Sequence, residues 1–173
     1  WKYGYDRYFD SFDHYYSLYQ RRNLDLWAEY ADGKVTKEEL NRQRYLYPLE
    51  AVGAGDSTLA KAYERDALTM IPTKSKLMPH AREVLEYLSR KYNLYILSNG
   101  FKELQSHKMR SSGIDEYFKK VVLSDDIGIL KPWPEIFHFA LSTTQSELNN
   151  SLMIGDSWEN DIVGAAGVGM HQV

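Results

Sequence analysis

The chain has 173 residues, enough for one ordinary domain or for a core domain with a small accessory one. Its apolar fraction of 43%, charged fraction of 26% and net charge of −3 are typical of a globular protein and favour neither a nucleic-acid partner nor a membrane surface. The sequence contains no cysteine, which excludes disulfides, thiolate catalysis and cysteine-ligated zinc and fits a reducing, cytoplasmic location. No stretch approaches the roughly 18 consecutive apolar residues that a membrane-spanning helix needs.

Residues 1–75 are predicted to be helical. Thr36 followed by Glu39 fits a capping box at the start of one helix, and either Asp56 or Ser57 fits the cap of another. Aromatic residues also recur at helical spacing: Tyr8, Phe12, Tyr15 and Tyr19. These aromatic side chains fit either the core of a helical domain or one wall of a pocket for a base, and we favour the core.

Residues 76–173 show an alternating pattern. Three short apolar runs that end in polar residues are separated by helix-like segments: Leu94–Asn99, Lys120–Asp125 and Ser151–Asp156. This spacing is typical of strand–helix–strand units, which build a parallel sheet with helices on both faces. The pattern therefore predicts an α/β fold for this part of the chain.

Polar residues end all three predicted strands. They include Ser98 with Asn99 after the first, Asp125 after the second, and Gly155 with Asp156 after the third. The carboxyl ends of parallel strands line one edge of a sheet, where ligands bind. Such residues also end strands and cap helices, so only the three ends together indicate a functional site.

Asp156 and Asp161 are the candidate metal ligands. Mg²⁺ binds through oxygen ligands and takes only one or two protein carboxylates, so this pair at a strand end suits it. An equally open alternative is that Asp161 simply caps the helix that follows.

The turn Ser98–Gly100 and Lys131 are candidate phosphate-binding groups. A hydroxyl and backbone N–H groups at a strand-to-helix turn favour a phosphate, and a lysine held by Pro132 could neutralise one. Taken alone, each of these motifs also fits an ordinary surface loop.

In this order, the Ser-Asn-Gly turn, the Lys-Pro pair and the Gly-Asp pair with a second Asp resemble motifs two, three and four of the haloacid dehalogenase (HAD) superfamily. The resemblance covers roughly residues 77–169, and residues 1–75 are similar to part of that family's helical cap. It implies a Rossmann-like parallel sheet with flanking helices in residues 76–173, plus an α-helical cap domain. Within the superfamily, the chain is most similar to the pyrimidine 5′-nucleotidases.

The resemblance implies a hydrolase that uses Mg²⁺ to cleave a small phosphomonoester, with a nucleoside monophosphate as one candidate. The attack would form an aspartyl-phosphate that water then cleaves. Asp156 would ligate the metal, and Asp161 would ligate it or hold its waters. The implied substrate-binding residues are Ser98, Asn99, Gly100 and Lys131. Ser98 and Lys131 would also act in catalysis.

Two other functions stay open. One is halide removal from haloacids, which needs no metal, and the other is non-catalytic binding of a phosphorylated ligand. The family's nucleophile is an Asp-x-Asp motif on a strand that precedes the cap, and no apolar run followed by such a motif occurs in this sequence. We therefore expect this strand to precede Trp1, and the core to lack its first strand and its C-terminal end.

We predict that residues 1–173 made alone are poorly folded and inactive. The resemblance places the first strand between the strands that end at Asn99 and Asp156, so its loss leaves backbone groups on both neighbours unpaired. Phosphatase turnover by a purified sample of residues 1–173 would contradict this prediction.

Overall fold

The computed structural model describes residues 2–173 and divides the chain into two compact units, Trp1–Ile71 and Pro72–Val173. Each unit is described by itself. None of the helices in the described residues is long and apolar enough to cross a membrane. The interpretation of the first unit as a cap domain stays a prediction.

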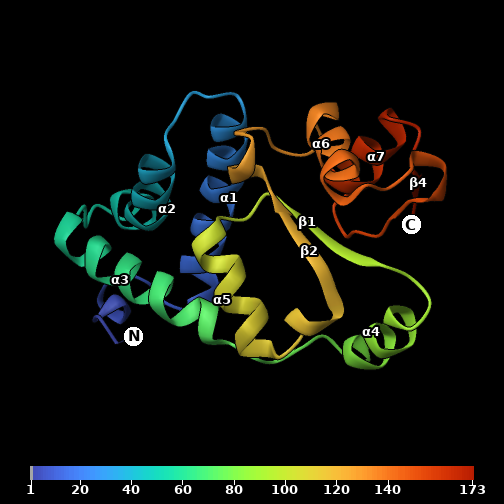
Figure 1. Ribbon diagram of the computed structural model, residues 1–173. Helices are drawn as coiled ribbons and strands as arrows, with labels where there is room; N and C mark the ends of the chain where they lie inside the picture. Colours follow the sequence, from blue (N-terminus) through green and yellow to red (C-terminus); the bar gives the residue numbers. More distant parts are fainter. Residues whose placement is uncertain (1) are drawn as a thin grey trace. The chain divides into compact units, whose positions relative to one another are not determined.

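The first unit is built from helices, and its described residues contain no strand. A 3₁₀ turn at Tyr5–Arg7 precedes three α-helices (Figure 1): α1 Phe12–Ala31, α2 Lys37–Ala51 and α3 Ser57–Met70. α1 packs against α2, and α2 packs against α3. The predicted helical character of this region agrees with these elements.

Side-chain caps fix where the helices of the first unit begin. The Thr36 hydroxyl accepts a hydrogen bond from the Glu39 backbone N–H at 3.1 Å, and the Asp56 carboxylate caps α3 in the same manner. In a full capping box the Glu39 carboxylate would also accept a hydrogen bond from the Thr36 backbone N–H. Here the Glu39 carboxylate instead accepts from Arg42 and Gln43. These hydrogen bonds hold the pKa of Glu39 below its usual value.

Aromatic residues form the core of the first unit. The fully or almost fully buried members of this core are Tyr5, Phe9, Tyr15, Leu46, Leu49 and Ala60. The Tyr63 ring lies within 6 Å of the rings of Tyr5, Tyr15 and Tyr45. Burial raises the pKa of the Tyr15 hydroxyl, so it stays protonated. Of the predicted aromatic run, Tyr15 lies in this core and Tyr19 packs against it, whereas Tyr8 and Phe12 are 39% and 59% exposed.

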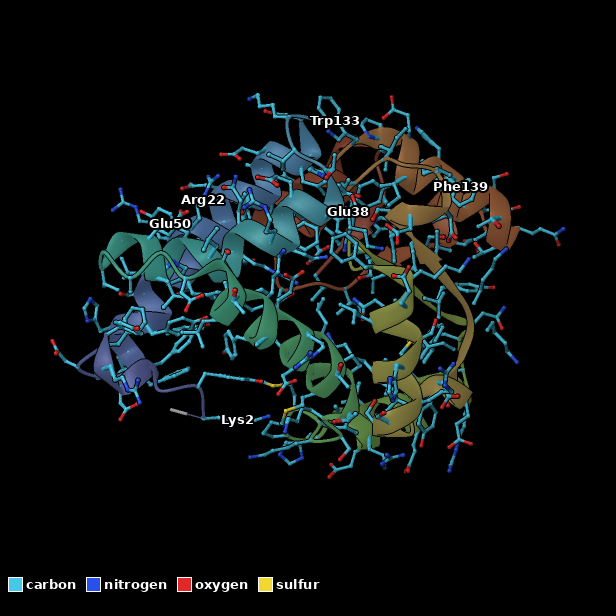
Figure 2. The ribbon with its side chains drawn as sticks, turned by 90° about the vertical axis from the view of Figure 1, so that its left-hand side faces the viewer. Lys2, Arg22, Glu38, Glu50, Trp133 and Phe139 are labelled. Atoms are coloured by element: carbon cyan, nitrogen blue, oxygen red, sulfur yellow. The ribbon has the colours of Figure 1, made fainter. Side chains whose placement is uncertain are left out.

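A polar contact joins α1 to α2 at the surface. Arg22, labelled in Figure 2, donates to both carboxylate oxygens of Glu29 on its own helix and to Gln43 on α2. The two-pronged guanidinium matches the carboxylate and the amide oxygen at once. The contact therefore adds a directional link to the apolar packing of these helices.

The second unit alternates helices and strands, as predicted (Figure 1). Its elements are α4 Ala81–Ser89, β1 Leu94–Ser98, α5 Lys102–Ser112, β2 Phe118–Leu123, α6 Pro134–Thr144, β3 Leu152–Met153, α7 Gly164–Gly167 and β4 His171–Gln172. A π-helical turn, Trp158–Val163, leads into α7. The α/β class is confirmed.

The described strands pair in parallel, but they form two two-stranded sheets instead of one continuous ladder. β1 pairs with β2 and β3 pairs with β4. The third predicted run, Ser151–Asp156, is extended and paired only over Leu152–Met153, and β4 was not foreseen. Beyond Met153 the chain turns toward the π-helical turn, and only the Gly155 N–H still bonds across, to the Val173 carbonyl at 3.2 Å.

One apolar core joins the two strand pairs. Ile136 and Phe137 of α6 are completely buried and pack with Ala165 and Met170. Leu97 of β1 and Met153 of β3 are among the half-buried residues that pack against this cluster. The ends of β1 and β3 are therefore anchored to the same apolar core through Leu97 and Met153.

We predict that Leu26→Ala lowers the free energy of unfolding by about 2–5 kcal/mol, because the Leu26 side chain is completely buried and its removal leaves a cavity. Leu24→Ala is the matched control on the same helix, since Leu24 is 64% exposed and should change stability by about 0.5 kcal/mol or less. Urea denaturation of both variants, made in the full-length protein, measures the difference, and equal losses would contradict the burial of Leu26.

Candidate active site

The turn after β1 is organised around the Ser98 hydroxyl. Its Oγ accepts one hydrogen bond from the Gly100 backbone N–H at 3.0 Å and one from the Gln105 side-chain Nε2 at 2.8 Å. A side chain at position 100 would collide with Gln105, because a Cβ there would lie 2.1 Å from Nε2. The Gly100 N–H, expected to bind phosphate, is therefore already used within the turn.

Asn99 ties this turn to the loop that carries Lys131. Its side-chain Oδ1 accepts from the Lys131 N–H at 2.7 Å, and its Nδ2 donates to the Lys131 carbonyl at 2.9 Å. One amide side chain thus satisfies both backbone groups of a residue 32 positions away. The sequence predicted a role for the Asn99 backbone, whereas the structure shows that the Asn99 side chain positions the lysine loop.

Lys131 is a buried cation with two partners. Its Nζ donates to the Leu97 carbonyl at 2.9 Å and to Asp161 Oδ1 at 2.5 Å. Lys131 is 9% exposed and Asp161 is 4% exposed. An ammonium group has three N–H donors, so one remains for a further acceptor.

The loop reaches the surface two residues later. Trp133, labelled in Figure 2, is 54% exposed. Its backbone N–H donates to the Leu130 carbonyl at 3.0 Å and closes a turn. The loop therefore carries a buried charge and an exposed ring almost side by side in the sequence.

Asp161 is fixed by its second oxygen as well. Its Oδ2 accepts from the Ser157 backbone N–H at 3.1 Å. The cap of the π-helical turn is Ser157, whose hydroxyl accepts from the Asn160 N–H, so the interpretation of Asp161 as a simple helix cap is wrong. Gly155 makes room for this carboxylate, because a Cβ there would lie 2.4 Å from Asp161 Cγ.

The two predicted magnesium ligands, Asp156 and Asp161, are one exposed and one buried carboxylate. Asp156 is exposed just after the third strand, and each Asp161 oxygen already accepts one hydrogen bond. Among residues 2–173, no group of three or more acidic or histidine side chains is placed to hold a metal. A site with only two protein carboxylates is compatible with Mg²⁺, since this ion binds through few protein carboxylates and keeps waters or substrate oxygens as its other ligands.

The sequence assigned no individual role to two of the residues that shape this site. Gln105 contacts Ser98, and the Asp125 carboxylate accepts from the Lys102 backbone N–H at 3.0 Å at the start of α5. Asp125 ends the second predicted strand, which was its only signal. Nothing in the sequence distinguished Gln105, since a glutamine on a polar helix is common.

Most of the chain matches a known protein family. A sequence model of the haloacid dehalogenase-like hydrolases matches residues 2–169. The chain belongs to the haloacid dehalogenase-like hydrolases. The family resemblance drawn from the three motifs is thereby confirmed.

Individual members of the HAD family are similar over most of the chain. The pyrimidine 5′-nucleotidase YjjG of Escherichia coli is 30% identical over 153 residues, which cover 88% of this chain and 66% of YjjG. The Bacillus subtilis protein YfnB, which carries a HAD-hydrolase name, is 30% identical over 155 residues, covering 88% of this chain and 64% of YfnB. The chain thus spans slightly less than two thirds of the length of these relatives.

The fold is also that of solved HAD structures. A crystal structure of YfnB bound to magnesium superposes with a TM-score of 0.85 at 27% identity, covering 94% of this chain and 72% of YfnB. This likeness supports the description of the fold as a Rossmann-like core with a helical cap.

We predict that Asp161→Leu lowers the free energy of unfolding by about 3–5 kcal/mol, because it leaves the Lys131 ammonium buried without a counter-charge. The double variant Lys131→Met with Asp161→Leu should recover most of this loss, since it buries no charge. The exposed pair Lys34 and Asp32 is the control, and its disruption should cost at most about 1 kcal/mol. Chemical denaturation of these variants in the full-length protein tests the prediction, and a double variant no more stable than Asp161→Leu would contradict it.

Proposed function

We propose that this protein hydrolyses phosphate monoesters of small metabolites with the help of Mg²⁺. The observation that carries this proposal is the buried Lys131 ammonium, which is fixed by the Leu97 carbonyl and Asp161 and keeps one donor for an anion. Asn99 holds its loop against the turn that contains the Ser98 hydroxyl. The turn after β1, which carries Ser98, and the loop that carries Lys131 thus hold each other in place.

Ser98 and Lys131 would bind the phosphoryl group. The Ser98 hydroxyl would donate to one phosphate oxygen, and the Lys131 ammonium would offset the negative charge that develops as the phosphoryl group is transferred. Both groups are held in place before a substrate arrives, so little reorganisation opposes the reaction. Gly100 would contribute space rather than a donor, because its N–H is bound to Ser98.

Asp156 and Asp161 would hold the magnesium ion. Asp156 would ligate it directly, while Asp161, whose two oxygens already accept from Lys131 and Ser157, is better suited to hold the waters of the metal. Bound Mg²⁺ shields the charge of a phosphate and so favours attack by an anionic nucleophile.

The nucleophile would be an aspartate of the Asp-x-Asp motif that the HAD resemblance implies, outside residues 1–173. Attack of its carboxylate on phosphorus would break the ester bond, release the alcohol and leave an aspartyl-phosphate, which water would then hydrolyse to inorganic phosphate. The residues of this chain would bind and orient the phosphoryl group through both steps.

A nucleoside 5′-monophosphate is our first candidate substrate. The relatives YjjG and, at 27% identity over 92% of this chain, PynA of Streptococcus pneumoniae are named pyrimidine 5′-nucleotidases. A glyceraldehyde 3-phosphate phosphatase of Pyrococcus abyssi is 39% identical over 97 residues, so small sugar phosphates belong in the same substrate panel. A cytoplasmic location stays a prediction that rests on the cysteine-free sequence.

Halide removal from haloacids is the weaker candidate. A 2-haloacid dehalogenase of Pseudomonas syringae superposes with a TM-score of 0.60 at 23% identity, which is a likeness of fold alone. The pair Asp156 and Asp161 favours a reaction that uses a metal.

We predict that Asp156→Ala in the full-length protein lowers kcat/KM for the best phosphate ester by about 100-fold or more, because a direct metal ligand is lost. Asp115→Ala, an exposed carboxylate in the 3₁₀ turn before β2, is the matched control and should leave activity unchanged. Release of inorganic phosphate from a panel of nucleotides and sugar phosphates, with and without Mg²⁺, measures both. Undiminished metal-dependent activity of Asp156→Ala would contradict the proposal, and halide release that survives EDTA would favour the dehalogenase.

A further inference from the structure

We propose that Gln105 is a positioning residue that aims the Ser98 hydroxyl proton at the phosphate. This inference rests on the proposed function and assigns a role to a residue outside the three HAD motifs described above. It follows from the hydrogen-bonding capacity of the serine hydroxyl and from the way in which α5 is held.

Both acceptor positions of the Ser98 hydroxyl are occupied. A serine Oγ has two lone pairs and one proton to donate. The Gly100 N–H takes one lone pair at 3.0 Å, and the Gln105 Nε2 takes the other at 2.8 Å. The O–H bond must therefore point away from both donors. The hydroxyl is left as a pure donor, which is the form that an acceptor-only phosphate oxygen requires.

The surrounding structure determines where the Gln105 amide lies. The Gln105 backbone N–H donates to the Phe101 carbonyl at 3.0 Å in the first turn of α5, and the Lys102 backbone N–H donates to the Asp125 carboxylate in the 3₁₀ turn that follows β2. The start of α5 is thus anchored to the turn after the neighbouring strand. Phe101, which precedes the helix, is 3% exposed.

The backbone of the turn leaves space for this amide at one position. A Cβ on residue 100 would lie 2.1 Å from Gln105 Nε2 and 2.8 Å from its Cδ, so only glycine accommodates the amide against the turn. Gly100 and Gln105 therefore act together. The glycine admits the amide, and the amide orients the hydroxyl.

Removal of the Gln105 donor should free the hydroxyl to rotate. Methionine has a similar length but no hydrogen-bond donor. In Gln105→Met, the Ser98 hydroxyl can therefore rotate and donate its proton to acceptors other than phosphate. The predicted loss is in phosphate affinity, and it depends on the presence of the Ser98 hydroxyl.

A double-mutant cycle tests this dependence in the full-length protein. The dissociation constant for inorganic phosphate is measured by calorimetry in the parent, Gln105→Met, Ser98→Ala and the double variant. We expect Gln105→Met to weaken binding by about 10-fold when Ser98 is present and by less than about twofold in the Ser98→Ala background. His107→Met, an exposed position on the same helix, is the control and should have no effect.

The possible outcomes separate this inference from the proposed function. Equal losses in both backgrounds would mean that Gln105 only stabilises the helix, and no loss in either would mean that it is dispensable; both overturn the inference. A parent that binds no phosphate overturns the proposed function instead. In that case the side-chain amide NMR signals of Gln105 decide the inference, since they should shift in Ser98→Ala, and unchanged signals would overturn it.

Discussion

The buried ion pair between Lys131 and Asp161 is the constraint on which the rest of the site depends. Neither charge can be buried alone without a penalty of several kcal/mol, so each requires the other and further hydrogen bonds. The Leu97 carbonyl and the Ser157 N–H supply them. Gly155 follows from the same demand, since a side chain there would displace the carboxylate.

The apolar core of the second unit fixes the positions of the elements that carry this ion pair. Phe137 lies completely buried on α6, and a Cβ at Gly164 would come within 2.7 Å of its ring and 3.1 Å of the Pro132 Cα. The small residue thus lets α7 approach both α6 and the lysine loop. Because Leu97 and Met153 pack on the same core, the ends of β1 and β3 are placed by apolar packing although no ladder joins them.

The two units differ in what their polar groups do. In the first unit, tyrosine rings bury apolar area and act as core, and burial raises the pKa of the Tyr5 and Tyr15 hydroxyls. In the second unit, the buried Lys131 ammonium donates to the Leu97 carbonyl of β1, the half-buried Ser98 hydroxyl ends the same strand, and each keeps one donor for an anion. This convergence at one strand end is why we assign phosphate binding to the second unit.

The sequence by itself determined the features that depend on neighbours within a few positions. Helix caps at Thr36 and Asp56, the α/β alternation and the three motifs of the HAD family all follow from local spacing. Only the tertiary structure decided that the Asn99 side chain holds the Lys131 backbone, that Asp161 pairs with that lysine, and that β4 is the partner of β3. These contacts join residues about 20 to 30 positions apart, and which of many polar side chains meet over such a distance is set by how the apolar core packs.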